Sequence, residues 1–361
     1  MPQIASSLSL RIVIAVLLLQ IYLFQITGLF NLLDIFSPVL QNSRNNNSSN
    51  TNLKSTKKVP NFILLSPPKC GAIIIDKFLS YHPHLTSAFT KNIRYFDEFY
   101  DHGEEWYLNQ LYNHYSPRRT KTNDERFNRQ NLTDPDFQEL FYETSESYFN
   151  NIETIRKISN TFRQEKSTKI IISTCNPTLR AYNLYKFRKY TTNSNADFKN
   201  FIEKNLPKII ESFESDGKSP YEFNSKMAMF ENYKKSLDSY IFQTWSIFLD
   251  GFLHPYINWW RNSPFGKSRG DPNSVSKILL VNFEYFKETP WIVLNNIEEF
   301  LGIENFFQES LFQKSSNDDK YFLKDISEVE TIWGRDYLKV EDVPEEGRMV
   351  LENFYEKFSK K

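Results

Sequence analysis

The sequence predicts an α/β fold in which a central parallel sheet carries helices on both faces and one transmembrane helix precedes it. Three buried apolar runs carry this prediction, at residues 62–65, 170–173 and 279–283, and each is followed by a helical pattern. Apolar strands that alternate with helices are typical of a parallel sheet covered on both faces. Because ligands of such sheets bind beyond the carboxyl ends of the strands, we expect Lys69 and Asn176 to face a common cleft.

The N-terminal part predicts a membrane anchor. Residues 12–33 are apolar apart from four scattered polar residues, which is about the length that spans a bilayer as a helix. No Ala-x-Ala-like cleavage site follows, so we expect an uncleaved signal anchor after a cytosolic tail of residues 1–11. Residues 34–58 are rich in Asn, Ser and Thr and predict a flexible stem before a lumenal domain of residues 59–361. Glycosylation sequons begin at Asn46, Asn47 and Asn131.

The composition excludes several classes of protein. The chain has 361 residues with 44 basic and 44 acidic side chains, and zero net charge argues against a general nucleic-acid binder.

The two cysteines, Cys70 and Cys175, show neither a disulfide framework nor zinc-site spacing, and we expect no metal. Both follow predicted strands that end at the same cleft. We expect free thiols, with a disulfide between them as the alternative.

The first strand leads through a tight loop into a helix that carries Ile75, Phe78 and Leu79. Such a loop places backbone N–H groups at a helix N-terminus, where the helix dipole favours an anion. Lys69 adds a positive charge there, although an ordinary strand-to-helix turn with a surface lysine is the alternative. The loop is not a Walker A motif, because no Gly-Lys-Ser/Thr follows a first glycine at the required spacing.

Later segments predict further elements. Residues 116–136 are polar and predict a long exposed loop, and residues 140–143 predict a short strand. Residues 254–273 are rich in Pro, Gly and Trp and predict a loop, within which residues 259–261 are either a sugar-binding patch or a buried anchor. A helix over residues 291–301 is predicted to end at the glycine that follows it.

Five motifs follow the first loop in a fixed order. They are Asn92-Ile93-Arg94-Tyr95-Phe96-Asp97 with Gly103, Trp106 and Tyr107 downstream; Glu143-Thr144-Ser145-Glu146-Ser147-Tyr148-Phe149; Asn176-Pro177-Thr178-Leu179-Arg180-Ala181-Tyr182-Asn183; Phe300-Leu301-Gly302; and Trp333-Gly334-Arg335. With Pro68-Lys69-Cys70-Gly71-Ala72, they make about residues 59–337 resemble a carbohydrate sulfotransferase domain of the heparan sulfate sulfotransferase family. The chain is most similar to the sulfotransferase domain of heparan sulfate N-deacetylase/N-sulfotransferases, then to heparan sulfate glucosamine 3-O-sulfotransferases, as a divergent member.

The resemblance implies a P-loop-NTPase-like sulfotransferase fold and transfer of a sulfuryl group from 3′-phosphoadenylyl sulfate (PAPS) to glucosamine units of a heparan-sulfate-type glycosaminoglycan. It also implies a glycosylated, single-pass type II protein of the Golgi membrane with a lumenal body. Lys69 and the positions now held by Asn92 and Thr144 would be catalytic. PAPS or its product PAP would contact Lys69, Cys70, Gly71, Ala72, Ile73, Cys175, Asn183, Trp333, Gly334 and Arg335.

The chain departs from this family at the groups that carry the chemistry. The resemblance places a glutamate general base at Asn92, and an amide cannot accept a proton near neutral pH. It places lysines at Thr144 and Trp333, and hydroxyl residues at Ala72 and Ile73. Losing one electrostatic donor can raise a barrier by about 3–4 kcal/mol, so we expect strongly impaired turnover.

Other side chains could replace the missing groups. Glu143, Glu146 or Asp97 could supply a carboxylate, and Arg94 could supply a cation, with a solvated surface charge as the alternative for Arg94. Two other functions stay open. One is a pseudo-sulfotransferase that binds nucleotide, glycan or an active partner without turnover, and the other is an unrelated lumenal anchor or adhesion protein.

Overall fold

The computed structural model describes residues 59–112, 139–162, 168–192, 197–214, 245–266, 275–312 and 339–359. The predicted tail, membrane anchor, stem, polar loop and three sequons lie outside these residues, as do Trp333, Gly334 and Arg335. Within the described part, no helix is long and apolar enough to cross a membrane.

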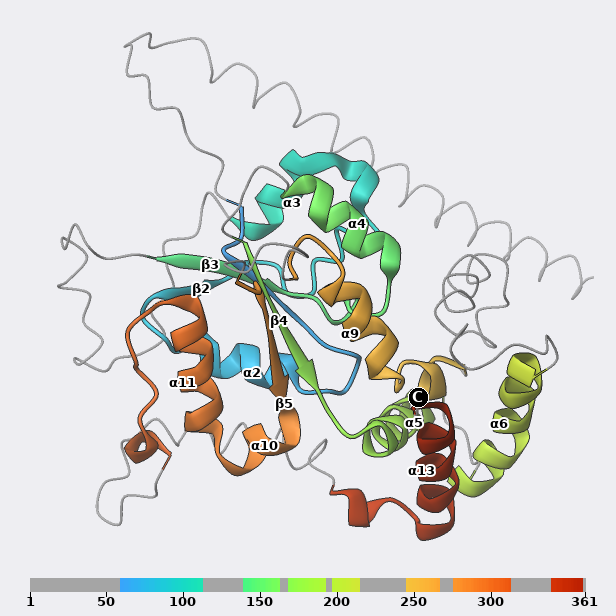
Figure 1. The fold of residues 1–361 in the computed structure, drawn as a ribbon. Helices are drawn as coiled ribbons and strands as arrows, with labels where there is room; N and C mark the ends of the chain where they lie inside the picture. Colours follow the sequence, from blue (N-terminus) through green and yellow to red (C-terminus); the bar gives the residue numbers. More distant parts are fainter. Residues whose placement is uncertain are drawn as a thin grey trace, which may run out of the picture. The chain divides into compact units, whose positions relative to one another are not determined.

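The sheet has five strands in the order β2-β3-β1-β4-β5 (Figure 1). Their bounds are β1 Phe62–Leu65, β2 Leu85–Ser87, β3 Leu140–Thr144, β4 Lys169–Thr174 and β5 Ile278–Asn282. Every neighbouring pair is parallel, which confirms the predicted parallel sheet and its strands. The edge strand β2 was not predicted, because three residues are too few to show a period.

Helices cover both faces of this sheet (Figure 1). On one face Phe62 and Leu64 of β1 pack in a core with α2 (Ala72–Leu79), α10 (Phe283–Glu288) and α11 (Pro290–Leu301). On the other face Ile63 and Leu65 pack in a core with α3 (Gly103–Leu111), α4 (Ile152–Thr161), α5 (Pro177–Thr192), α6 (Phe198–Glu214), α9 (Leu253–Arg261) and α13 (Glu345–Ser359). Burial of alternate residues on opposite faces explains why β1 is a continuous apolar run.

The strand order creates a topological switch point between β1 and β4. From β1 the chain crosses to β2 and β3 on one side, and it then returns to β4 and β5 on the other. The helices that follow these two strands, α2 and α5, cover opposite faces. We call the side of the sheet where the five strands end the carboxyl edge. Ligands of doubly wound sheets bind in the crevice at this edge, at the switch point.

The predicted loop over residues 254–273 is wrong in its first half, where α9 forms. Tyr256 and Trp260 are fully buried one helical turn apart, and the Trp260 indole donates to the Phe149 carbonyl at 3.0 Å. This apolar spacing outweighs the helix-breaking composition. Trp260 is therefore a buried anchor and not an exposed sugar platform.

The predicted end of the helix over residues 291–301 is confirmed. Gly302 has the left-handed φ of 77°, and its N–H donates to the Glu298 carbonyl at 2.8 Å. Pro290 begins the helix, where its missing N–H costs no hydrogen bond. This closes α11 over the face that also carries α2.

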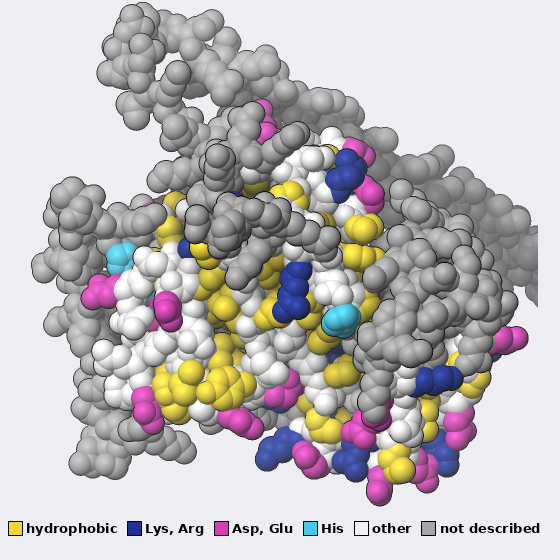
Figure 2. Space-filling model, viewed as in Figure 1, with side chains coloured by type: hydrophobic (Ala, Val, Ile, Leu, Met, Phe, Trp, Pro, Cys, Tyr) yellow, Lys and Arg dark blue, Asp and Glu magenta, His cyan; other side chains and the backbone are white. Residues whose placement is uncertain are grey.

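The surface agrees with the balanced composition. Figure 2 shows Lys and Arg side chains interspersed with Asp and Glu over α6 and α13. One such pair joins these helices, with Lys199 Nζ 2.6 Å from Glu346 Oε2. Charges of both signs on one surface do not create the single-sign field expected for a general nucleic-acid binder.

Candidate functional site

The loop between β1 and α2 has the backbone of an anion-binding turn. Lys69 and Gly71 have φ values of 74° and 84°, and the Cys70 N–H donates to the Pro67 carbonyl at 3.1 Å. A Cβ on Gly71 would lie 2.1 Å from the Phe283 ring, so only glycine fits beside this ring. Gly71 also leaves the N-terminal turn of α2 without a side-chain cap. Such a helix start presents N–H groups to an anion.

One predicted cofactor-binding residue, Asn183, lies on α5, which the side chain of Lys69 contacts. The Lys69 ammonium lies 4.3 Å from the centre of the Phe187 ring on α5. Asn183 precedes Phe187 by one helical turn and therefore shares its side of α5. The structure thus brings Lys69 to α5 one helical turn from Asn183, whose side chain is buried. Ala72 is buried in α2, and Ile73 is exposed beside it.

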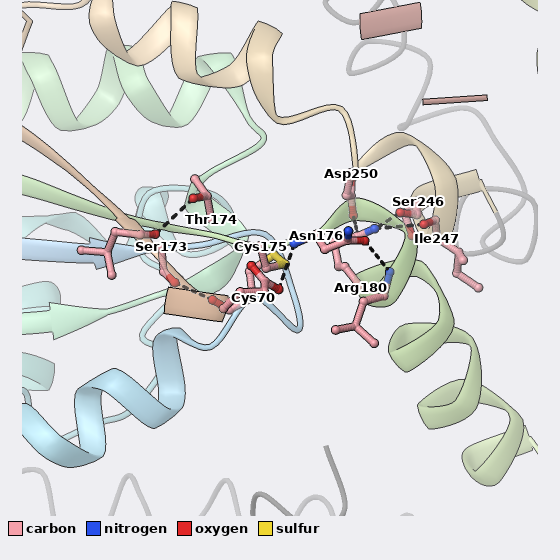
Figure 3. Close-up of a disulfide and its surroundings, with 12 residues drawn as sticks. Cys70, Ser173, Thr174, Cys175, Asn176, Arg180, Ser246, Ile247 and Asp250 are labelled. Atoms are coloured by element: carbon pink, nitrogen blue, oxygen red, sulfur yellow. Dashed lines mark hydrogen bonds and ion pairs between the residues drawn. A yellow bond between two sulfur atoms is a disulfide. The ribbon is translucent and has the colours of Figure 1, made fainter. Parts of the chain in front are cut away.

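Cys70 and Cys175 form a disulfide, which corrects the expectation of free thiols (Figure 3). Their Cα atoms are 5.2 Å apart because β1 and β4 are neighbours and their loops leave the sheet side by side. Ser173 adds a second link through its hydroxyl, which donates to the Cys70 carbonyl at 2.5 Å. Both cysteine side chains are therefore structural links at the switch point, and neither thiol is available to a ligand.

Asn176 follows Cys175 at the carboxyl edge, in the loop that the disulfide joins to the loop of Lys69, and the common cleft of Lys69 and Asn176 stays a prediction. Its N–H donates to Glu284 Oε1 at 3.0 Å, and its side-chain oxygen accepts from the Leu179 N–H at 3.0 Å, which caps α5. Arg180, in the same motif, is fully buried and points toward Ile247 and Asp250 (Figure 3). Its guanidinium donates to the Ile247 carbonyl at 2.9 Å and to an Asp250 oxygen at 3.2 Å. Arg180 therefore has a structural role.

Two of the predicted catalytic positions, Asn92 and Thr144, are in direct contact. The Asn92 N–H donates to the Thr144 carbonyl at 3.2 Å, and the Asn92 side chain is exposed. Thr144 ends β3 and donates through its hydroxyl to Asp76 Oδ1 at 3.2 Å. The positions are therefore brought together although their side chains are not the expected acid and cation.

Asp76 is a site residue that the motifs missed. It lies on α2, is only 6% exposed, and accepts hydrogen bonds from Ser87 at 3.1 Å and from Lys91 at 2.6 Å. The signal in the sequence is a single acidic residue in the otherwise apolar start of a helix. Because α2 packs on β3, this carboxylate reaches the ends of β2 and β3.

Glu143 is too deeply buried to replace the missing base. Burial raises the pKa of Glu143 to about 8, the hydrogen bond from Tyr107 at 3.0 Å lowers it, and the charge of Asp97 raises it again. The side chain is therefore mostly protonated near neutral pH. Its Oε2 and the hydroxyls of Ser66 and Ser145 have no hydrogen-bond partner among the described residues.

Two of the other suggested substitutes, Arg94 and Asp97, form an ion-pair cluster with Glu98. The Arg94 guanidinium lies 3.1 Å from Asp97 Oδ2 and 2.5 Å from Glu98 Oε2. The Arg94 side chain is 42% exposed, so it fits the alternative of a solvated surface charge. Asp97 Oδ2 is engaged in the ion pair with Arg94.

No protein-family model matches the chain. A stretch of 129 residues, 36% of the chain, is 27% identical to the membrane-associated sulfotransferase kil1 of Dictyostelium discoideum. The match covers 23% of that relative, so the chain spans about a quarter of its length. This similarity supports the resemblance to sulfotransferases at the level of the family.

Two solved structures are similar at low scores. A sulfotransferase from Alicyclobacillus acidocaldarius has a TM-score of 0.43 at 18% identity, over 77% of this chain and 93% of that one. The sulfotransferase domain of the Synechococcus PCC 7002 olefin synthase has a TM-score of 0.37 at 13% identity, over 85% and 98%. The α/β fold described above stands on its own sheet topology.

Proposed function

We propose that this protein is a divergent, membrane-anchored sulfotransferase that binds PAPS or PAP at the carboxyl edge and transfers the sulfuryl group poorly. One observation carries the proposal. The loop with Lys69 and the start of α5 meet at the switch point between β1 and β4, where the Cys70–Cys175 disulfide links them. The uncapped N-terminus of α2 in this crevice suits one phosphate group of such a nucleotide.

The residues present fit the nucleotide in part. The uncapped start of α2 and the ammonium of Lys69 suit the 5′-phosphate. Asn183 can donate an amide hydrogen bond to a second phosphate. The disulfide removes the Cys70 and Cys175 side chains from this set, so their contribution is backbone geometry. We extend the set to Trp333, Gly334 and Arg335 from the resemblance alone.

The proposed transfer lacks a proton acceptor. In it a bond forms between sulfur and the acceptor nitrogen or oxygen while the bond from sulfur to the phosphate oxygen breaks. The electron pair stays on the phosphate, and the acceptor loses a proton. Asn92 cannot take that proton, and Glu143 is buried and protonated. General-base catalysis contributes about 10²- to 10⁴-fold, so slow turnover is the expected result.

The acceptor and the compartment follow from the same reasoning. The motif order favours glucosamine units of a heparan-sulfate-type glycosaminoglycan. Disulfides persist in oxidising compartments, so the disulfide supports a lumenal domain in the secretory pathway, which we place in the Golgi. A type II anchor at residues 12–33 would hold it there.

A second candidate is a catalytically inactive relative that binds nucleotide, glycan or an active partner. The amide at Asn92, the mostly protonated side chain of Glu143 and the ion pair of Asp97 with Arg94 favour it. Binding and turnover separate the two candidates, because the nucleotide contacts remain where the catalytic groups have changed.

The test uses the full chain in detergent. Calorimetry with PAP should show binding, and Lys69→Ala should weaken it. Lys77→Ala is the control and should leave the affinity unchanged, because Lys77 lies on α2 over the Tyr81 ring. Labelled-sulfate transfer from PAPS to heparosan with free amines should be far below about 1 per second. Turnover at an ordinary enzyme rate would contradict the proposed impairment. Absence of PAP binding would contradict the whole proposal.

A further inference from the structure

Lys91 and Asp76 form an ion pair at the carboxyl edge that the motifs do not assign. The Lys91 ammonium lies 2.6 Å from Asp76 Oδ2 and also donates to the Ser87 hydroxyl. The Lys91 side chain is 54% exposed, whereas that of Asp76 is 9% exposed. The ammonium is therefore anchored on its inner side and open to solvent on its outer side.

Asp76 is held in place by hydrogen bonds from two strands, β2 and β3. Its Oδ1 accepts from Thr144 at the end of β3 and from Ser87 at the end of β2. Its backbone carbonyl accepts from the Tyr142 hydroxyl at 3.1 Å. A buried carboxylate is costly unless it is paired with a cation. Lys91 therefore has one preferred position, unlike a lysine in a fully exposed pair.

The carboxylate of Asp76 lies between Lys91 and Thr144 and contacts both. Oδ1 contacts the Thr144 hydroxyl and Oδ2 contacts the Lys91 ammonium, so a single carboxylate separates the two groups. The next residue, Asn92, also contacts the Thr144 carbonyl. A cation is thus present beside position 144, although it comes from the segment that follows β2.

We propose that Lys91 binds the sulfuryl group of the bound sulfuryl-phosphate donor, and that Asp76 is a positioning residue that directs it; this rests on the proposed function. An ammonium has three N–H donors, and the contacts with Asp76 and Ser87 leave one for an anionic oxygen. Charge-assisted hydrogen bonds are roughly twice as strong as neutral ones. Lys91 thereby replaces the lysine that the resemblance places at Thr144.

The experiment compares PAP, which lacks the sulfuryl group, with PAPS, on the full chain in detergent. Lys91→Met should leave PAP affinity within about twofold and weaken PAPS binding about tenfold, since one charge-assisted contact is lost. Lys77→Met is the matched control, because Lys77 is the neighbour of Asp76 on α2 and lies 5.2 Å from the Tyr81 ring. It should change neither affinity.

Two further variants separate binding from folding. Lys91→Met leaves Asp76 without its cation. The double variant Lys91→Met/Thr144→Lys supplies a new cation beside Asp76 and should restore the preference for PAPS. Asp76→Asn should keep PAP binding and lower the PAPS preference. An unchanged ratio of PAPS to PAP affinity in Lys91→Met, in protein that still binds PAP, would overturn the inference alone. If the unmodified chain binds neither nucleotide, the proposed function fails and the inference fails with it.

Discussion

Cys70 and Cys175 lie at the ends of two neighbouring strands, with Cα atoms 5.2 Å apart and a disulfide between them. One follows β1 and the other follows β4, so the bond joins the two loops that flank the switch point. Each loop begins a helix on a different face of the sheet. The link therefore couples the two layers of the fold at the place where we propose that the nucleotide binds.

Reduction of this disulfide should destabilise the protein. The bond closes a loop of 105 residues, and removal of such a cross-link costs about 2–5 kcal/mol. Denaturant unfolding of the full chain should shift to lower concentration with a reductant. The Cys70→Ser/Cys175→Ser variant should unfold at the same lower concentration with and without reductant. Equal midpoints for the oxidised and reduced natural chain would contradict this prediction.

Gly71→Ala should destabilise the protein more than Gly103→Ala does. Both glycines have φ near 80°, where a Cβ is strained by about 1 kcal/mol. At Gly71 the new Cβ would also lie 2.1 Å from the Phe283 ring, whereas no atom of the described residues lies within 4 Å of one at Gly103. Moving Phe283 should add roughly 1–3 kcal/mol and weaken PAP binding. Equal unfolding free energies of the two variants would show that the ring moves without cost.

The central strands could be predicted from the sequence, because each is a run of neighbouring apolar residues. Ile170, Ile171 and Ile172 form a β-branched run that both faces bury, so a strand was evident without any partner. The disulfide depends on the pairing of Leu65 with Ile172, which no local pattern contains.

The cluster of Asp76, Ser87 and Lys91 could not be predicted for the same reason. Asp76 meets Lys91 only because β2, a strand of three residues, adds to β3 and places Ser87 and the following segment over α2. A single Asp in an apolar helix has no motif. Side chains that are joined by strand register are therefore the part of the site that sequence reasoning could not find.

Glu143→Gln should make the protein more stable at alkaline pH. The folded-state pKa of Glu143 is about 8 and its ordinary value is 4.5, so between these values the folded state holds a proton that the unfolded state has lost. Stability from this group is therefore complete at low pH and falls as the pH rises toward 8. Gln keeps an acceptor for Tyr107 and has no proton to lose.

The measurement is the difference in unfolding free energy between Glu143→Gln and the natural chain at pH 5 and pH 8. Between pH 5 and pH 8, we expect the unfolding free energy of Glu143→Gln to increase by more than about 1 kcal/mol relative to that of the natural chain. Glu153→Gln on the surface of α4 is the control for a general carboxylate effect, since Glu153 is exposed and paired with Arg156 at 2.9 Å. A pH-independent difference for Glu143→Gln would mean that the carboxyl is not buried in solution.

Asn92→Glu should raise the rate of sulfuryl transfer, because it supplies a proton acceptor where the acceptor group would bind. Asn92 has a left-handed φ of 53°, which suits asparagine, so the change costs about 1 kcal/mol of stability. Its exposed side chain leaves room for a carboxylate. Against that cost, a positioned base contributes about 10²- to 10⁴-fold, so a gain of about 100-fold is expected.

Asn92→Gln is the matched control, because it has the same size and cannot take the proton. Labelled-sulfate transfer from PAPS to heparosan with free amines measures both variants. If Asn92→Glu is no faster than Asn92→Gln, the missing base is not what limits turnover, and the chain is better described as a nucleotide-binding relative without transferase activity.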